Sequence, residues 1–215
     1  MYKGWIFDLD GVITDTAEYH YQAWKALADR EGIPFSHKQN EALRGVSRAD
    51  SLRLLLQGRE VDQSKFLEMM EWKNNHYVSL LEKMSPANVF PGVRELLLEL
   101  GKNGVRIALG SSSKNALRVL ELLDLSSAFD AVVDGNSVAS AKPAPDVFLK
   151  AAELLKLNPR DCVVVEDAES GVEAALCGGF CVVGIGPVER VGKAHIQYTQ
   201  PEEISILEVN QLKKI

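Results

Sequence analysis

The stretch Trp5-Ile6-Phe7-Asp8-Leu9-Asp10-Gly11-Val12, close to the start of the chain, decides the fold. Its apolar first half predicts a buried strand, which ends on two carboxylates separated by one leucine. In an open parallel sheet, ligands bind beyond the carboxyl ends of the strands. Strand side chains alternate between faces, but the turn that Gly11 permits lets Asp8 and Asp10 reach one crevice. The pair therefore predicts a site that uses a metal ion or a proton transfer.

The composition of the 215-residue chain is ordinary, with 46% apolar residues, 25% charged residues and a formal net charge of −6. This length accommodates one domain, or one domain that carries an insertion. The negative charge argues against nucleic-acid and anionic-membrane surfaces, because both favour an excess of Lys and Arg. The longest uncharged stretch, residues 174–188, is too short and too rich in glycine for a membrane helix. We expect a monomer with no nucleic-acid partner and no membrane association.

The cysteines and the N-terminus indicate the compartment. Cys162, Cys177 and Cys181 are odd in number and lie in apolar surroundings, which favours reduced thiols over disulfides or a zinc site. No signal-peptide pattern is visible, because Asp8 comes before any long apolar segment. We therefore expect a cytoplasmic protein.

Most of the chain alternates between strand and helix patterns. Apolar runs predict strands at residues 5–8, 105–110, 131–134, 162–166 and 180–184. Helical patterns lie between them, at residues 93–100, 114–123, 145–155 and 171–177. Strands that are apolar throughout and alternate with helices indicate a parallel sheet covered on both faces. The predicted fold is α/β, a doubly wound parallel sheet of the Rossmann-like type.

One segment, residues 15–87, breaks the alternation and shows no convincing strand. Asp15 and Glu18 resemble a capping box at the start of a helix that runs to Gly32. Further helical patterns cover residues 47–56 and 64–84. An insertion directly after the first strand lies above the carboxyl end of that strand. We therefore expect a catalytic core of residues 1–14 and 88–215, with a helical cap of residues 15–87.

Polar residues follow several of the predicted strands and would meet at one edge of the sheet. They are Asp8 with Asp10, Ser111, Lys142, and Glu166 with Asp167. Two carboxylates 4 Å apart repel by about 4 kcal/mol at an effective dielectric constant of 20, so a cation must offset the repulsion. Oxygen ligands without His or Cys favour a hard cation, and Mg2+ is commonly paired with a substrate phosphate.

The run Ser111-Ser112-Ser113-Lys114-Asn115 follows a strand and opens a helix. Free backbone N–H groups and hydroxyls at such a position suit an anion, most naturally a phosphate. An ordinary serine cap is the alternative interpretation of the run. Its place in the same sheet as the carboxylates favours the phosphate interpretation.

Three features of the cap carry weaker signals. Lys73 lies on the apolar stripe of its helix, where a lysine either extends its ammonium to solvent or reaches for an anion. Extension to solvent is the favoured interpretation. His20 and Trp24 share a helix face, and a histidine beside a tryptophan is more often structural than catalytic. Arg44 and Arg48 flank a flexible glycine, which suits bidentate phosphate recognition or a solvated loop.

With these motifs, the chain resembles the haloacid dehalogenase-like superfamily, with an inserted α-helical cap. The core motifs are Asp8-Leu9-Asp10-Gly11-Val12, Ser111, Lys142-Pro143 and Glu166-Asp167. A narrower resemblance, to the sugar-phosphate mutases of this superfamily, rests on residues 10–20, Trp24, residues 44–48, residues 73–77 and residues 142–146. Together the motifs span residues 1–186.

The resemblance implies a role for each matching residue. Asp8 would be the nucleophile that carries an aspartyl-phosphate, and Asp10 the general acid and base. Mg2+ would be held by Asp8, the Asp10 carbonyl, Glu166 and Asp167. The phosphate-binding residues would be Ser111, Ser112, Ser113, Lys114, Asn115, Lys142 and Arg48. The substrate-facing cap residues would be Thr16, His20, Trp24, Gly45, Val46, Ser47, Ser51 and Lys73.

The implied reaction is the interconversion of beta-D-glucose 1-phosphate and D-glucose 6-phosphate through an aspartyl-phosphate and glucose 1,6-bisphosphate. A small-molecule sugar phosphate is therefore the expected partner. Two alternatives stay open from the sequence: a Mg2+-dependent sugar-phosphate phosphatase, and a non-catalytic sugar-phosphate-binding domain with the same fold. Ser112 and Ser170 stand where the superfamily often has alanine, and the stretch from Pro187 onward carries no motif.

Overall fold

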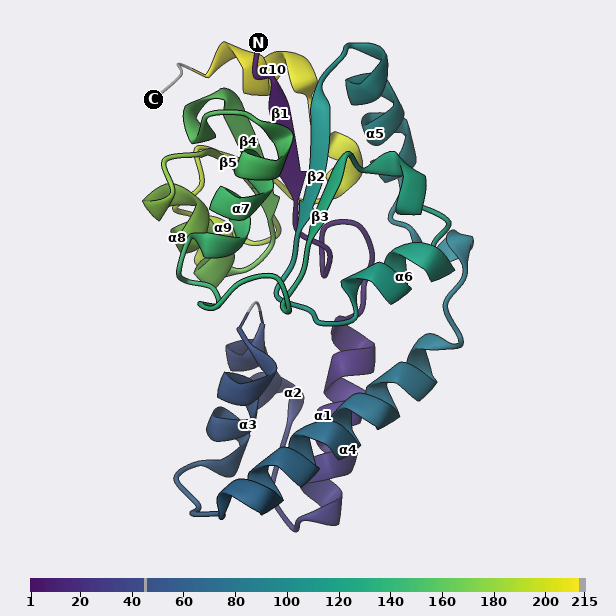
Figure 1. Cartoon of the computed structure of the whole chain (residues 1–215), viewed down its shortest axis with the longest axis vertical. Helices are drawn as coiled ribbons and strands as arrows, with labels where there is room; N and C mark the ends of the chain where they lie inside the picture. The colour runs from purple at the N-terminus through teal and green to yellow at the C-terminus, as the bar shows by residue number, and fades with distance from the viewer. Residues whose placement is uncertain (45, 213–215) are drawn as a thin grey trace.

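The computed structural model describes residues 1–44 and 46–212 and shows a six-stranded sheet between layers of helices (Figure 1). All neighbouring strands are parallel, in the order β3-β2-β1-β4-β5-β6. The strands are β1 (Gly4–Phe7), β2 (Arg106–Gly110), β3 (Ala131–Val133), β4 (Cys162–Glu166), β5 (Cys181–Ile185) and β6 (Ile196–Tyr198). The predicted doubly wound α/β fold is confirmed.

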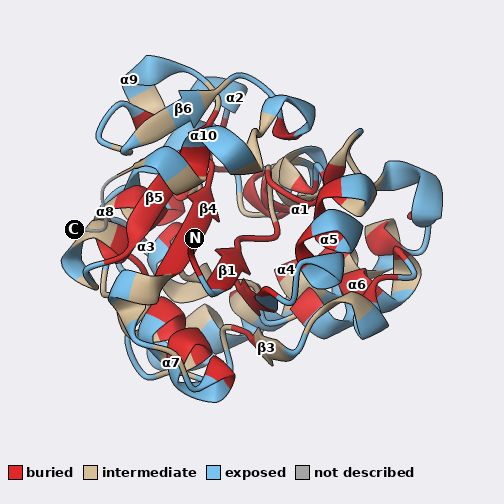
Figure 2. Ribbon diagram, turned by 90° about the horizontal axis from the view of Figure 1, so that it is seen from above, coloured by how far each residue is buried: buried red, intermediate tan, exposed pale blue. Residues whose placement is uncertain are grey.

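Alternating strand residues bury themselves in two separate cores, one on each face of the sheet. Val163 and Val165 of β4 join one core, whereas Val164 between them joins the other. The first core includes residues of α5 (Val93–Lys102), α6 (Ala116–Leu122) and α10 (Ile206–Gln211). The second includes residues of α7 (Asp146–Leu155), α8 (Glu169–Cys177) and α9 (Val188–Val191). Figure 2 shows the buried strands running between these two helical layers.

The boundaries of several elements differ from the sequence-based expectation by one or two residues. β1 ends at Phe7, so Asp8 is the first residue beyond the strand. The edge strand β6 was not predicted, because it has three residues and no apolar run. Short 3-10 turns occupy Glu41–Leu43, Pro86–Asn88, Ser126–Ala128, Pro159–Asp161 and Pro201–Glu203.

Of the five α-helices described between β1 and β2 in the sequence, the first four lie beyond the carboxyl ends of the strands (Figure 1). They are α1 (Ala17–Arg30), α2 (His37–Asn40), α3 (Arg48–Leu56) and α4 (Gln63–Leu81). Their buried side chains form a third apolar cluster, which includes Trp24 and Leu27 of α1, Leu52 of α3 and Met69 of α4. We call residues 15–87 the cap. Within the described residues, no helix combines the length and apolar character that crossing a membrane requires.

The capping box predicted at Asp15 and Glu18 does not form. The N-cap residue of α1 is Thr16, and its hydroxyl donates a hydrogen bond to the Asp10 carboxylate instead of capping the helix. Asp15 accepts a hydrogen bond from the Ala17 backbone N–H at 3.0 Å. The side chain of the N-cap residue Thr16 is therefore directed toward Asp10, in the turn that follows β1.

Candidate active site

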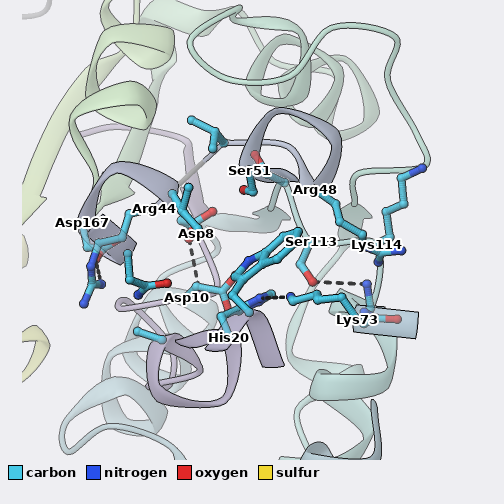
Figure 3. Close-up of a pocket in the computed structure, with 17 residues that line it drawn as sticks. Asp8, Asp10, His20, Arg44, Arg48, Ser51, Lys73, Ser113, Lys114 and Asp167 are labelled. Atoms are coloured by element: carbon cyan, nitrogen blue, oxygen red, sulfur yellow. Dashed lines mark hydrogen bonds and ion pairs between the residues drawn. The ribbon is translucent and has the colours of Figure 1, made fainter. Parts of the chain in front are cut away.

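A pocket lies between the carboxyl edge of the sheet and the cap, and both parts contribute side chains to it (Figure 3). The residues that line it are Asp8, Asp10, Ala17, His20, Trp24, Asn40, Leu43, Arg44, Val46, Arg48, Ser51, Lys73, Ser112, Ser113, Lys114, Asn115 and Asp167. Six separate parts of the sequence therefore contribute to the pocket, and many of the lining residues are those singled out above.

Lys142 joins two of the buried carboxylates at the base of the site. Its Nζ lies 2.6 Å from Asp8 Oδ1 and 2.7 Å from Glu166 Oε1. It also donates to the Gly110 carbonyl at 3.2 Å, and its side chain is fully buried. The two carboxylates raise the pKa of Lys142 against the effect of burial, so the ammonium stays charged. Residues 8, 142 and 166 thus form one ionic cluster.

The turn after β1 brings both aspartates to the pocket, as expected from Gly11. Gly11 has a φ of +84°, and the Asp10 backbone N–H donates to Asp8 Oδ2 at 2.9 Å. A Cβ at position 11 would lie 2.3 Å from Asp167 Oδ2, so glycine is also required for the close approach of that carboxylate. The Asp10 side chain accepts from the Thr16 hydroxyl.

Burial and mutual repulsion raise the pKa values of the carboxyl groups. Desolvation raises the pKa of Asp8 well above its ordinary value, with Lys142 opposing and Glu166 adding to the effect. Desolvation also raises the pKa of Asp10, against its hydrogen bond from Thr16. Burial together with Glu166 raises the pKa of Asp167 to about 7. A further cation in this group would lower all three values.

Asp167 faces two arginines. Arg44 Nη1 of the cap lies 3.1 Å from Asp167 Oδ2, and Arg190 Nη2 of the core lies 4.0 Å from the same oxygen. Arg190 stands in the C-terminal stretch in which the sequence offered no motif. A lone arginine after a proline gives no pattern, so nothing in the sequence alone singled it out.

The donor chemistry of the site fits a hard divalent cation. Asp8, Glu166 and Asp167 are nearly inaccessible to solvent, and the first two share the ammonium of Lys142. Asp10 adds a fourth carboxyl group to the site. A Cβ on Gly171 would lie 1.7 Å from Glu166 Oε1, so that carboxylate requires a glycine beside it. Among residues 1–44 and 46–212, no three His, Cys, Asp or Glu side chains are already grouped to hold a metal ion. Lys142 pairs with Asp8, and Arg44 pairs with Asp167. The oxygen donors suit Mg2+.

The serine-rich run follows β2 as predicted, but its helix begins later, at Ala116. Ser111 is fully buried, and its Oγ accepts from the Ser113 backbone N–H at 3.1 Å. Ser113 Oγ in turn accepts from the Asn115 N–H at 3.2 Å. The run is thus a compact turn that presents residues 112–115 to the pocket. Asn115 also donates to Asn74 Oδ1 of the cap at 2.9 Å.

The favoured interpretation of Lys73, an ammonium extended to solvent, is wrong. Lys73 is 2% exposed, and its Nζ lies 2.9 Å from His20 Nδ1 (Figure 3). The ammonium sits 4.6 Å from the Trp24 ring centre and 4.8 Å from that of Tyr77, within cation–π distance. Burial and nearby Arg48 lower the pKa of Lys73 well below its usual value. The Lys73 ammonium is therefore held among His20, Trp24 and Tyr77 instead of extending to bulk solvent.

Several of the remaining predicted cap residues line the same pocket, but Ser47 and Thr16 do not. Arg48 is the first residue of α3 and lines the pocket with Val46, Ser51 and Trp24. Ser47 caps α3, because its Oγ accepts from the Asp50 N–H at 3.1 Å. Burial lowers the pKa of Arg48. Gly45, which the sequence assigned to the cap site, lies outside the described residues.

Comparison with known proteins identifies the group to which this site belongs. Residues 2–179 match the haloacid dehalogenase-like hydrolase family. The chain is 41% identical to a beta-phosphoglucomutase of Bacillus subtilis, over 95% of this chain and 92% of the relative. It is 32% identical to a phosphorylated carbohydrates phosphatase of Thermotoga maritima, over 98% of both chains. A crystal structure of beta-phosphoglucomutase from Clostridium difficile superposes with a TM-score of 0.94 at 38% identity, over 98% of this chain and 96% of that one.

Sequence, fold and site agree with these similarities, including the resemblance to sugar-phosphate mutases. The chain belongs to the haloacid dehalogenase-like hydrolase family, in its beta-phosphoglucomutase branch.

Proposed function

We propose that this chain is a beta-phosphoglucomutase, which interconverts beta-D-glucose 1-phosphate and D-glucose 6-phosphate through an aspartyl-phosphate and glucose 1,6-bisphosphate. The observation that carries the proposal is one pocket in which Asp8 and Asp10 face the cap residues Arg48 and Lys73. The mutase from Bacillus subtilis, similar over nearly the whole chain, supports it.

Asp8 and Asp10 divide the chemistry between them. An Asp8 carboxylate oxygen bonds to phosphorus in the sugar bisphosphate while the bond from that phosphorus to the sugar oxygen breaks. Asp10 gives a proton to the departing sugar oxygen. In the opposite direction, Asp10 takes the proton from the sugar hydroxyl that attacks the phosphorus of phosphorylated Asp8. The raised pKa of Asp10 suits a group that must hold and release a proton.

Magnesium completes the core half of the site in this proposal. Proteins of this family generally depend on Mg2+. Asp8, Asp10, Glu166 and Asp167 would hold the ion, as the oxygen donors and their mutual repulsion favour. When bound, Mg2+ would neutralise charge on the transferring phosphoryl group. Lys142 and the Ser111–Ser112 turn would supply the other positive and donor groups around that phosphoryl.

The second phosphate of the sugar would bind away from Asp8. Arg48 of the cap and Ser113, Lys114 and Asn115 of the core line the same pocket and are suited to this role. A phosphate bound there would contact both the cap and the core and would therefore hold the two together. Closure around the sugar then excludes water, which a mutase needs because phosphorylated Asp8 must react with a sugar hydroxyl in preference to water.

The other cap residues would shape the sugar subsite. Thr16 is tied to Asp10, and His20 is tied to Lys73, so both connect the cap to groups of the pocket. Trp24, Val46 and Ser51 line the wall of the pocket. We assign Gly45 and Ser47 to the same subsite by resemblance.

We also propose a monomeric, cytoplasmic protein. Its three cysteines are free, with Cys162 and Cys181 buried, which suits a reducing compartment. The net charge of −6 gives no support to a nucleic-acid partner.

An assay of purified protein with beta-glucose 1-phosphate, Mg2+ and a trace of the bisphosphate tests the proposal. We expect glucose 6-phosphate to form, with alpha-glucose 1-phosphate as the matched control that gives none. Rapid release of free phosphate without glucose 6-phosphate would overturn the proposal in favour of a phosphatase, the activity named for the relative from Thermotoga maritima.

A further inference from the structure

Four alternating charges connect the cap to the core beside the pocket. Glu41 and Arg44 belong to the cap, whereas Asp167 and Arg190 belong to the core. Glu41 Oε2 lies 3.2 Å from Arg44 Nε and 3.6 Å from Arg190 Nη1. Asp167 Oδ2 lies 3.1 Å from Arg44 and 4.0 Å from Arg190. We call this cluster the charge square.

The Asp167–Arg44 pair of the charge square is shielded from water and is therefore stronger than a surface pair, whereas Glu41 is 55% exposed and makes surface pairs. The side chain of Asp167 is 6% exposed, and those of Arg44 and Arg190 are each 26% exposed. The Arg190 guanidinium passes close to the backbone of Gly186, because a Cβ there would lie 2.6 Å from its Nη2. Arg44 is also held through its backbone, because Ser170 Oγ donates to the Arg44 carbonyl at 3.5 Å.

Asp167 already faces two arginines, and of these Arg44 is the one attached to the cap. Under the proposed function, Asp167 also binds the divalent cation, which carries the same sign of charge. A cation on Asp167 repels the Arg44 guanidinium, and Arg44 opposes the cation by the same coupling free energy.

We infer that Arg44 is a positioning residue that couples divalent-cation binding at Asp167 to the position of the cap. Cation binding loosens the charge square and frees the cap to open for a sugar phosphate, whereas the intact square holds the cap against the core. Arg44 contacts Asp167 and not the serine-rich turn, so it is distinguished from Arg48, to which we assign the phosphate. The inference rests on the proposed metal site.

The first test measures cation affinity directly. Mn2+ is titrated into wild type, Arg44→Gln and Arg44→Lys, and the free ion is followed by its electron paramagnetic resonance signal. We expect Arg44→Gln to bind Mn2+ about tenfold more tightly, within the range of typical coupling between sites, with Arg44→Lys close to wild type. Arg53→Gln is the matched control, because Arg53 pairs with Asp50 within the cap, and its affinity should equal that of wild type.

Two kinds of outcome in that titration would contradict two different claims, the coupling through Arg44 and the metal site itself. Unchanged or weaker Mn2+ binding in Arg44→Gln overturns the coupling. Wild type that binds no Mn2+, or Asp167→Asn that binds it as tightly as wild type, removes the metal site from the proposed function and the inference with it.

The second test reads the cap position. Cys177 is the exposed native cysteine of the core, and Leu67→Cys adds an exposed thiol on α4 of the cap. Spin labels at these two positions report the distance between cap and core by pulsed dipolar spectroscopy. We expect Mg2+ to shift the distance distribution of this double-labelled protein, and expect Arg44→Gln in the same background to show the shifted distribution without Mg2+. A distribution that does not change with either Mg2+ or Arg44→Gln contradicts the inference.

Discussion

The two halves of the pocket carry opposite charge and are built differently. The core half holds four carboxyl groups, and short ion pairs join two of them to Lys142. A third, Asp167, pairs with Arg44 of the cap. The cap half presents Arg48 and Lys73, and burial together with repulsion from Arg48 lowers the pKa of Lys73. Repulsion among carboxylates is relieved by a metal ion, whereas repulsion among cap cations is relieved by an anion. The core half is therefore suited to phosphoryl chemistry, and the cap half to recognition of an anionic substrate.

Removing the nucleophile has the largest expected effect. Asp8→Asn should lower both mutase turnover and phosphate release by at least about three orders of magnitude, because an amide cannot form the aspartyl-phosphate. Steady-state assays of both products measure the loss, and circular dichroism checks that the fold is retained. Substantial residual activity would mean that another group attacks phosphorus.

Arg48→Ala should separate the two halves of the site. We expect isomerisation to fall by about two orders of magnitude, because a charge-assisted phosphate contact is lost, while hydrolysis of phosphorylated Asp8 changes little. The matched variant Arg53→Ala removes an exposed cap arginine that pairs with Asp50 and should leave both rates unchanged. An equal loss of both rates in Arg48→Ala would contradict the division of labour between cap and core.

Gly171→Ala should damage the core half through one methyl group. The added Cβ would lie 1.7 Å from Glu166 Oε1, so the carboxylate must move, at a cost of about 1–3 kcal/mol in the free energy of unfolding. Gly101→Ala on α5 is the control, because its Cβ has no neighbour within 4 Å among the described residues, and should not destabilise the protein. Urea denaturation of both variants measures the difference. Equal stability of the two would show that Glu166 is not held tightly.

Of the variants considered, Lys73→Met should have the smallest effect. It should change the KM for the sugar phosphate without lowering the free energy of unfolding. Because burying an ammonium is costly, we expect the free energy of unfolding to be unchanged or higher by about 1 kcal/mol. The KM for the sugar phosphate should rise about tenfold. Lys65→Met on the same helix alters only surface ion pairs with Glu31 and Glu68 and should leave KM unchanged. A destabilised Lys73→Met variant with normal KM would assign Lys73 a structural role.

The core half was predictable from the sequence because strand geometry determines it. Asp8, Ser111 and Glu166 each end or follow a parallel strand, and parallel strands bring their carboxyl ends to one edge. The apolar runs that mark these strands are long enough to recognise. The three-residue strand β6 was missed because it has no such run.

The cap half was harder to predict because its contacts join distant helices. Lys73 on α4 meets His20 on α1, and the helical pattern of either segment alone does not give their separation. Arg190 on α9 lies 4.0 Å from Asp167, and the sequence around Arg190 contains no motif that predicts this contact. The N-cap position predicted at Asp15 is occupied by Thr16, and the Thr16 hydroxyl does not cap the helix because it donates to Asp10.

The central claim is that the core half transfers the phosphoryl group and the cap half determines which acceptor receives it. Phosphorus NMR of protein phosphorylated at Asp8, mixed with beta-glucose 1-phosphate or with buffer alone, tests it most directly. We predict that with the sugar phosphate nearly all of the phosphoryl group appears in glucose 1,6-bisphosphate and glucose 6-phosphate, far faster than it is released in buffer. Free phosphate appearing at the same rate in both samples would contradict the account.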